Sequence, residues 1–301
     1  VTGNPLVSIV IPFRDRVELL ETCVRAIVEK STYSNFEVLA VDNGSANQST
    51  LDALQRLEGL DSRLRFVRDD GDFNFSRIAN HATGQAMGEH LVLMNNDVEV
   101  ISEDWIQELL QHSQRPEVGA VGGKLYYRNG RVQHAGIVLG IHGFAGHSHH
   151  HLPGTIDGYM NRLRVVQNVS AVTAALLMVK KLAFEDAGGL DEEHLGTALS
   201  DVDFCLRLLE RGLLNVFTPR CEAYHDESAS RGHEVTPGKR ARFEHEIEWF
   251  KERHRDFLAK GDPYYNRNLT LATEKFSYVA GEPPHGGLVG TVDTQNQRRL
   301  R

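Results

Sequence analysis

Cysteine is scarce in this chain of 301 residues. Cys23, Cys205 and Cys221 lie far apart and form no CxxC pair. Disulfide-dependent secreted domains and cysteine zinc sites have closely spaced cysteines, so neither class is indicated. A reducing, cytoplasmic environment fits this composition best.

Long apolar runs are also missing. The most apolar later stretch, residues 165–179, is interrupted by Gln167 and Asn168. A bilayer-spanning helix needs about 20 apolar residues, so we expect no membrane span here. Because the chain begins with Val1 instead of methionine, a longer polypeptide could supply an anchor, which would allow peripheral membrane association.

Basic residues do not predominate. There are 33 Lys and Arg against 41 Asp and Glu, a net charge of −8. Proteins that grip nucleic acid through its phosphates have basic surfaces, so we expect no nucleic-acid partner. A glycine-rich phosphate loop with a following lysine is absent after the first predicted strand, where Pro12, Phe13 and Arg14 stand. This absence disfavours a sugar nucleotidyltransferase, one alternative for a Rossmann-like protein.

Short apolar runs alternate with amphipathic segments over roughly the first hundred residues. The runs at residues 6–11, 36–41, 63–67 and 91–94 predict strands, and the segments between them predict helices. This alternation predicts βαβ crossovers and a parallel sheet covered by helices on both faces. With 41% hydrophobic residues, the chain can bury a substantial core.

Polar side chains follow three of these strands. They are Asp42 and Asn43, then Asp69 and Asp70, then Asn95, Asn96 and Asp97. Ligands of parallel sheets bind beyond the carboxyl ends of the strands. Carboxylates and amides there suit a hard cation or a diphosphate, although the same residue types also form ordinary turns.

The second half predicts a more varied set of elements. Asn129-Gly130 indicates a hairpin between strands at 118–127 and 131–140. A further strand is expected at 167–179. Ser102 is the expected N-cap of a helix. A histidine-rich loop follows the hairpin; transition-metal binding and a flexible, acceptor-facing loop are alternatives for it. Its histidines are His142, His147, His149, His150 and His151.

A helix is predicted from Ser200 onward. Ser200 and Asp203 fit a capping box, which gives Asp203 a structural role supporting the helix end. Asp201 has no such explanation and points to another side of the helix. A long helix is predicted from Thr236-Pro237 to Leu258, and the Gly, Pro, Gln and Arg content beyond residue 281 predicts a disordered tail or linker.

Four motifs together resemble the signatures of the family-2 glycosyltransferases of GT-A fold. They are VSIVIP at 7–12, VDNGS at 41–45, the segment from Asn80 to Glu89, and LMNND at 93–97. The resemblance covers about 230 residues and is nearest to bacterial surface-polysaccharide and rhamnosyltransferase-like proteins. It implies an α/β fold in which a Rossmann-like nucleotide-binding sheet is fused to a mixed acceptor-side subdomain.

The same resemblance implies a domain organisation. The GT-A domain spans residues 1–230, with a nucleotide-sugar half at 1–100 and an acceptor half at 101–230. A C-terminal helical extension occupies residues 231–280, and residues 281–301 form the tail or linker.

The resemblance also implies roles for individual residues. Binding of the nucleotide and donor sugar is expected of Pro12, Phe13, Asp15, Asp42, Asn43, Asp70, Asn95 and Asn96. Asp97, from the variant DXD motif, and His225 are expected to bind a divalent metal, and the imidazole favours Mn²⁺ over Mg²⁺. Asp201 matches the catalytic base, whereas Asn95 and Ser200 replace acidic residues usual in the family.

These roles predict an inverting transfer from a nucleotide-diphosphate sugar to a hydroxyl of a glycan or lipid-linked glycan acceptor. The non-enzymatic alternative is an inactive GT-A carbohydrate-binding module, to which the replacements at Asn95 and Ser200 point.

Overall fold

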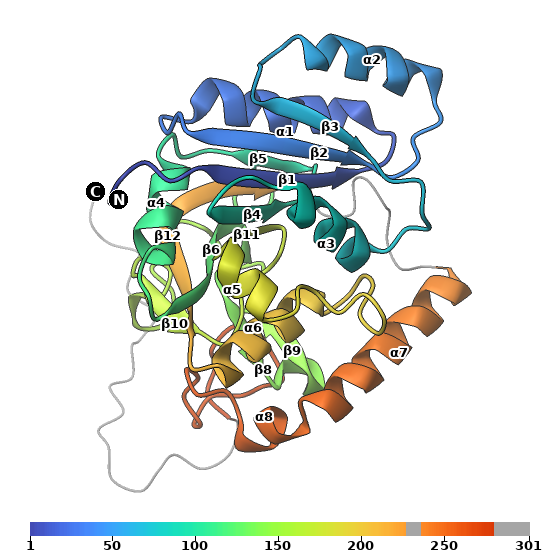
Figure 1. The fold of residues 1–301 in the computed structure, drawn as a ribbon. Coiled ribbons are helices and arrows are strands. Elements are labelled where there is room, and N and C mark those ends of the chain that lie inside the picture. Colours follow the sequence, from blue (N-terminus) through green and yellow to red (C-terminus); the bar gives the residue numbers. More distant parts are fainter. Residues whose placement is uncertain (227–235, 280–301) are drawn as a thin grey trace, which may run out of the picture.

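The computed structural model describes residues 1–226 and 236–279, and within these ranges ten strands form one mixed sheet (Figure 1). They are β1 (Val7–Phe13), β2 (Phe36–Asp42), β3 (Leu64–Arg68), β4 (His90–Met94), β5 (Val98–Val100), β6 (Val118–Tyr126), β7 (Val132–His134), β10 (Gln167–Val169), β11 (Leu176–Lys180) and β12 (Leu214–His225). The strand order is β10-β12-β6-β11-β4-β1-β2-β3, with β5 paired to β12 and β7 to β6. A separate hairpin contains β8 (Ile137–Leu139) and β9 (Ala145–His147).

Helices cover both faces of the sheet. They are α1 (Val17–Lys30), α2 (Gln48–Glu58), α3 (Phe75–Gln85), α4 (Trp105–Ser113), α5 (Lys181–Asp186), α6 (Ser200–Glu210), α7 (Pro237–Arg253) and α8 (Arg255–Lys260), with single 3₁₀ turns at Ile141–Gly143 and Tyr159–Asn161. Side chains of α1 and α4 join one buried cluster, and those of α3, α5 and α6 join the other. Successive strand residues point to opposite faces, so Val92 belongs to the first cluster and Leu93 to the second.

The first half is the predicted parallel sheet. β1 pairs in parallel with both β2 and β4, and β2 pairs in parallel with β3. The carboxyl ends of these four strands therefore lie along one edge of the sheet. The α/β architecture with helices on both faces is confirmed.

The second half of the chain adds both parallel and antiparallel strands to the sheet, and one strand prediction there is wrong. Residues 167–179 form two strands instead of one: β10 pairs with β12, whereas β11 lies between β4 and β6. Residues 170–175 connect them, so one apolar run serves two positions in the sheet. The hairpin at Asn129-Gly130 is confirmed as β6 and β7, but its second arm is short because β8 leaves to pair with β9.

Ser102 is not an N-cap. α4 begins at Trp105, and the Ser102 hydroxyl donates to the Arg220 carbonyl oxygen and accepts from the Glu222 N–H, both at 2.9 Å. The Ser102 side chain therefore binds the backbone of β12, a long-range contact that local sequence does not reveal.

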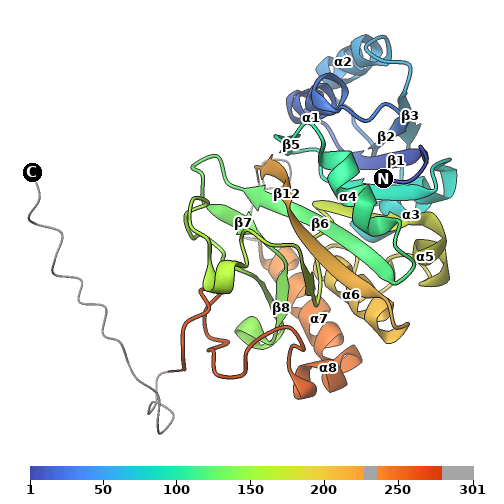
Figure 2. The same ribbon diagram turned by 90° about the vertical axis from the view of Figure 1, so that its left-hand side faces the viewer.

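The long C-terminal helix begins as predicted, with Pro237 in its first turn and the Thr236 side chain accepting from the Lys239 N–H, but its predicted extent to Leu258 is wrong, because α7 ends at Arg253 and α8 follows after His254. Beyond α8, Tyr265, Leu269 and Phe276 pack against Val138 and Ile141. Figure 2 shows this last described segment running past β8. The predicted tail at 281–301 lies outside the described residues.

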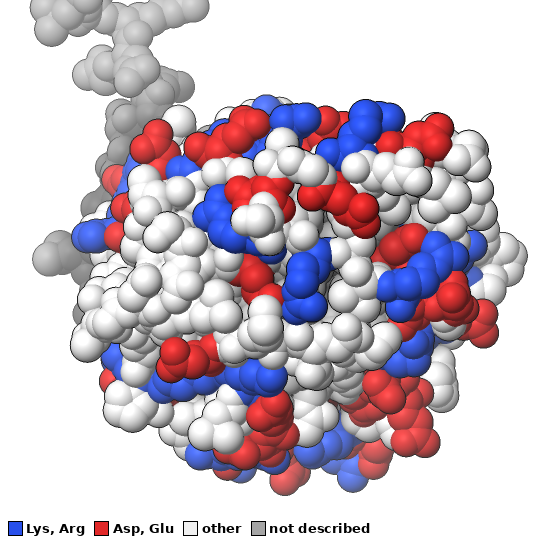
Figure 3. Space-filling model, turned by 45° about the horizontal axis from the view of Figure 1, so that its top comes forward, with Lys and Arg blue, Asp and Glu red and all other residues white. Residues whose placement is uncertain are grey.

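Two further properties concern possible membrane and nucleic-acid partners. In the described ranges, no helix is both long enough and apolar enough for a bilayer span. Acidic and basic side chains are interspersed on the face shown in Figure 3.

Candidate active site

The turn between β4 and β5 carries Asn95, Asn96 and Asp97. The Asn95 N–H donates to the Ala175 carbonyl oxygen at 3.2 Å, and the Asp97 carbonyl oxygen accepts from the Asp226 N–H at 3.0 Å. The Asp97 side chain is only 3% exposed. Backbone hydrogen bonds to two other segments thus fix this turn and leave its side chains for other contacts.

His225, the last residue of β12, lies against the turn. Pairing of β12 with β5 places His225 opposite Val98. Its Nε2 is 3.2 Å from Asp97 Oδ1 and 3.1 Å from Asn95 Nδ2. The structure therefore brings together Asn95, Asp97 and His225, which the sequence analysis had assigned to the donor sugar and the metal.

Gln133 on β7 determines which nitrogen of His225 carries the proton. His225 Nδ1 lies 2.7 Å from Gln133 Oε1, and Gln133 Nε2 donates to the His225 carbonyl oxygen at 3.5 Å. An amide oxygen can only accept, so Nδ1 donates to Gln133, and in the neutral ring Nε2 then carries a lone pair, to which the Asn95 amide also donates. Two atoms with lone pairs, His225 Nε2 and Asp97 Oδ1, consequently face each other.

This arrangement fits a divalent cation. Asp97 Oδ1 and Asn96 Nδ2 are buried and make no hydrogen bond with any described residue. A carboxylate oxygen and an imidazole lone pair suit a borderline cation such as Mn²⁺. Across residues 1–226 and 236–279, however, no group of three His, Cys, Asp or Glu side chains is arranged to hold a metal. Asp97 and His225 can thus supply two ligands, and the others must come from elsewhere.

Asp42 and Asp15 both fix the loop after β2. Asp42 accepts from the Ser45 N–H at 2.8 Å and from Arg68 at 2.5 Å. Asp15 Oδ1 accepts from the N–H groups of Ala46 and Asn47 at 3.3 and 3.2 Å. The two carboxylates are thus joined through one loop at the sheet edge.

Pro12 and Phe13 end β1 beside this loop, with Phe13 opposite Asp42. The Phe13 ring is buried and meets Phe66 edge to face, with centroids 6.3 Å apart. This ring therefore packs within the core beneath the loop after β2.

At the tip of β3, Asp69 instead of Asp70 points into the sheet edge. Asn43 Nδ2 donates to Asp69 Oδ1 at 3.1 Å, while Asn43 Oδ1 is buried without a hydrogen-bond partner among the described residues. Hydrogen bonds from Arg77 lower the pKa of the Asp69 carboxyl and outweigh the opposite effect of burial. Asp70 is exposed and pairs with Arg68 at 2.6 Å.

The predicted capping role of Asp203 is wrong. α6 starts at Ser200, preceded by Leu199, and no side chain caps it. The buried Asp203 carboxylate contacts Arg207 Nε and His254 Nε2, each at 2.8 Å. Burial alone would raise its pKa, but the hydrogen bonds from His254 and Arg207 hold it below the ordinary value. The helix begins one residue earlier than the capping box requires, with Leu199 instead of Ser200 at the N-cap, which turns Asp203 toward the core.

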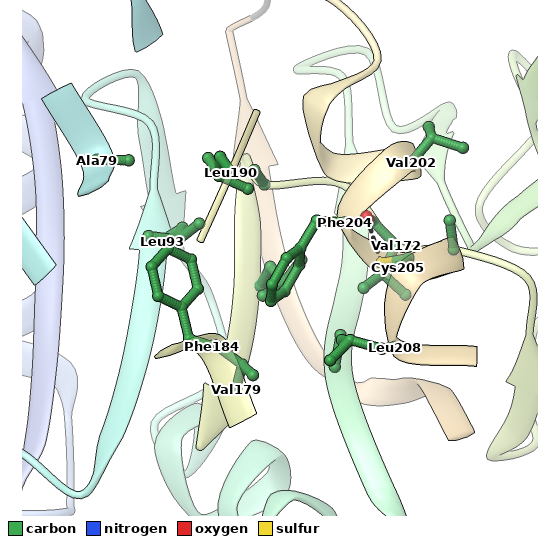
Figure 4. Packing of buried hydrophobic residues seen from close by; sticks show 14 of the residues in the cluster. Ala79, Leu93, Val172, Val179, Phe184, Leu190, Val202, Phe204, Cys205 and Leu208 are labelled. Atoms are coloured by element: carbon green, nitrogen blue, oxygen red, sulfur yellow. Dashed lines mark hydrogen bonds between the residues drawn. The ribbon is translucent and has the colours of Figure 1, made fainter. Parts of the chain in front are cut away.

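Asp201 is held by backbone groups. Its Oδ2 accepts from the Ala174 N–H at 3.0 Å and its Oδ1 from the Val202 N–H at 2.9 Å. The adjacent Ala175 binds Asn95, so residues 174–175 connect the Asp201 carboxylate with the β4–β5 turn. Phe204 and Cys205 anchor the same helix in the core (Figure 4).

The histidine-rich segment is tied to its surroundings. His147 Nδ1 lies 2.9 Å from Nδ1 of the buried His134, and His150 Nε2 lies 2.8 Å from the Tyr127 hydroxyl. His149 stacks on Phe276 with centroids 4.2 Å apart, and burial lowers the pKa of His149 to about 4. These contacts contradict the prediction of a flexible loop.

Sequence reasoning missed Gln133 and Arg68, and of the two aspartates at the tip of β3 it assigned Asp70 and not Asp69 to the donor site. Arg68 and Asp69 adjoin the chosen Asp70, but strand periodicity did not reveal which neighbour turns inward. Gln133 gave no local signal because its importance depends on a partner, His225, on another strand.

Comparisons with known proteins identify the family. The sequence pattern described as Glycosyl transferase family 2 matches residues 8–177. The chain belongs to glycosyltransferase family 2. Among solved structures, this family-2 chain resembles a mannosyltransferase, PcManGT from Pyrobaculum calidifontis in complex with GDP-Man and Mn²⁺, with a TM-score of 0.61 and 19% identity over 85% of this chain and 66% of that one. GalNAc-T7 with UDP, GalNAc and Mn²⁺ gives a TM-score of 0.66 and 13% identity over 84% of this chain and 50% of that one. The predicted GT-A fold is confirmed.

Sequence relatives include much longer proteins. Protein y4gI of Sinorhizobium fredii (strain NBRC 101917 / NGR234) is 49% identical over 93% of this chain, and the O-antigen biosynthesis protein RfbC of Myxococcus xanthus is 42% identical over 90%. The chain spans only 31% and 21% of their lengths. The N-acetylglucosaminyl-diphospho-decaprenol L-rhamnosyltransferase of Mycobacterium tuberculosis (strain ATCC 25618 / H37Rv) is 25% identical over 69% of this chain and 72% of its own length.

Proposed function

We propose that this family-2 domain transfers a sugar from a nucleotide-diphosphate donor to a hydroxyl of a glycan or lipid-linked glycan, with inversion at the anomeric carbon and dependence on a divalent cation. The observation that carries the proposal is the pair of facing lone-pair atoms on Asp97 and His225, buried at the carboxyl edge of the sheet. Relatives named for O-antigen biosynthesis and rhamnosyl transfer support the acceptor class.

The nucleotide is assigned to the β1–β2 edge. Asp42 would accept from an N–H of the base, and Asp15 holds the loop after β2 in place. Asn43 Oδ1, buried without a partner in the described ranges, is a second acceptor available at this edge. Asn95 and Asn96 would contact the donor sugar.

Asp97 and His225 would hold the cation. When bound, it neutralises the charge of the departing diphosphate and orients the donor. The imidazole favours Mn²⁺ over Mg²⁺, and the Mn²⁺ bound in two proteins of the same fold supports this choice.

Asp201 would act as general base. It takes the proton of the acceptor hydroxyl as that oxygen attacks the anomeric carbon and the bond to the diphosphate breaks. Proton transfer needs hydrogen-bond reach of about 3 Å and typically contributes about 10²–10⁴-fold. Both Asp201 oxygens accept one backbone N–H, which fixes their orientation and leaves each a further lone pair for the acceptor.

Calorimetric titration with UDP, GDP and dTDP, with and without Mn²⁺, tests the proposal. We expect one nucleotide to bind in a Mn²⁺-dependent manner and the matching nucleotide sugar to support transfer. Nucleotide binding without metal coupling and without transfer would favour the inactive carbohydrate-binding module. Full activity in excess chelator would contradict the metal assignment.

A further inference from the structure

Helix α7 reaches from the C-terminal extension to the loop that leads into α6. Glu246 Oε1 accepts from the Thr197 N–H at 3.1 Å, and Oε2 accepts from the Ala198 N–H at 2.9 Å. The Glu246 residue is 3% exposed. One carboxylate therefore holds two consecutive N–H groups that stand three and four residues before Asp201.

Two more contacts join the extension to the same part of the chain. The Trp249 ring stacks on His194, with centroids 4.6 Å apart and planes 13° apart. His254, which follows α7, contacts the buried Asp203 carboxylate two residues beyond Asp201. The extension thus contacts the chain on both sides of Asp201.

Apolar packing of Trp249 and Phe250 against the core holds part of α7, but it does not explain why Glu246 is buried. Of its 17 residues, only Glu246 and Phe250 are buried. Burying a carboxylate is unfavourable unless hydrogen bonds compensate for the lost water. A helix that only covered the core would present an apolar stripe there instead.

The loop held by Glu246 ends in a strained residue. Leu199, which follows Ala198, has φ 59° and ψ 4°, a left-handed conformation that side chains other than glycine rarely adopt. Such a conformation persists only where surrounding contacts enforce it. The Leu199 carbonyl oxygen accepts the Asp203 N–H at 2.9 Å in the first turn of α6. The direction of this turn sets where Asp201 points.

We propose that Glu246 is a positioning residue for the general base: by binding the N–H groups of Thr197 and Ala198 it fixes the turn at Leu199 and so orients Asp201. This inference rests on the proposed function, because it needs Asp201 to be the base. It makes the C-terminal extension part of the catalytic machinery, although the family pattern itself ends at residue 177.

Glu246→Gln tests the inference. The amide places an NH₂ group against one of the two N–H donors, so the loop should lose one anchor while the helix keeps its shape. We expect kcat to fall roughly 10- to 10²-fold, the size of effect that a misplacement of about 1 Å produces. Nucleotide and Mn²⁺ affinities should stay within about twofold of the parent because those ligands bind elsewhere.

Glu248→Gln is the matched control. Glu248 lies on the same helix, is exposed, and undergoes the same change of charge. It should retain the parent kcat. In Glu246→Gln alone, hydrogen exchange of the Thr197 and Ala198 amides should accelerate while core amides stay protected. A folded Glu246→Gln protein with the kcat of the control would overturn the inference.

Two further variants keep the outcome decisive. If Glu246→Gln does not fold, Trp249→Leu takes its place, because it removes the stack on His194. A lower kcat with unchanged nucleotide affinity in this variant supports the inference. An unchanged kcat overturns it. Asp201→Asn separates this inference from the proposed function. If Asp201→Asn turns over normally, the base assignment itself fails, whereas an inactive Asp201→Asn beside a fully active Glu246→Gln rejects only the positioning role.

Discussion

Two aspartates at the start of α6 differ sharply in their surroundings. Asp203 is 1% exposed and bound by Arg207 and His254, whereas Asp201 accepts the backbone N–H groups of Ala174 and Val202 and stays half-buried. A charge pair in the core stabilises the fold but cannot approach an acceptor sugar. The difference in burial therefore favours Asp201 as the base.

We expect Asp201→Asn to retain its fold, metal binding and nucleotide binding while turnover falls roughly 10²-fold or more. Asp203→Asn should instead lose about 3 kcal/mol of unfolding free energy, because it breaks a buried charge pair. Urea unfolding and transfer assays on both variants measure the two effects. Normal turnover in Asp201→Asn, together with a stable but inactive Asp203→Asn, would move the base to Asp203.

Gln133 should tune metal affinity without touching the metal. Gln133→Leu removes the acceptor that keeps the proton on His225 Nδ1, so we expect Mn²⁺ affinity to fall about 10- to 10²-fold. His225→Ala should weaken it at least as much. Electron paramagnetic resonance of free Mn²⁺ measures both, and Gln111→Leu, at an exposed position of α4, serves as control. If Gln133→Leu binds Mn²⁺ as tightly as the parent while His225→Ala binds it weakly, another group must orient the His225 ring.

At the scale of elements, strand β6 fits closely between its neighbours because of paired glycines. A Cβ on Gly122 would lie 2.6 Å from Val172 Cβ, and one on Gly123 would lie 2.6 Å from Cys221 Sγ. Val172 belongs to the segment that carries Ala174, the backbone partner of Asp201. The glycines thus allow the segment that binds the Asp201 carboxylate to approach the sheet.

Gly122→Ala should lower the free energy of unfolding by about 1–3 kcal/mol, since the added methyl group has no space. Gly84→Ala is the control: it lies in helix α3 with nothing near its would-be Cβ, and alanine should stabilise the helix by up to about 1 kcal/mol. Chemical denaturation of both variants checks this. Equal stabilities would contradict the close packing of β6.

At the scale of the whole molecule, two buried carboxylates link stability to pH. Asp69 and Asp203 both have folded pKa values below the ordinary 3.8. The unfolded chain therefore takes up protons first as pH falls. Their contribution is complete above about pH 5 and is lost as pH falls through 3.8 toward their folded pKa values.

Urea unfolding between pH 6 and pH 3 should show a falling free energy of unfolding over this window. The double variant Asp69→Asn/Asp203→Asn should be less stable at pH 6 and show a smaller decrease on acidification. An identical pH slope in the parent and the double variant would show that other groups control acid stability.

Local sequence determined the parallel half of this protein. Short continuous apolar runs and helical stripes defined β1 to β4 and α1 to α3, and the motifs at the strand ends gave the family before any contact was known. Asp97 was chosen from one of those motifs and His225 from its place after the last core strand, as the family resemblance implied, and the structure places them 3.2 Å apart. Side chains at strand tips can be found in this way because the sheet gathers its carboxyl ends at one edge.

Tertiary structure decided what local pattern leaves open. The division of residues 167–179 between two strands depends on which neighbours they pair with, and the role of Asp203 depends on Arg207 together with His254, a residue 51 positions away. The roles of Gln133 and Glu246 depend on hydrogen-bond partners on other elements. Burial and long-range hydrogen bonds have no signature in a short sequence window, so these two residues could not be predicted. Only the folded chain shows that the C-terminal extension holds the loop before Asp201.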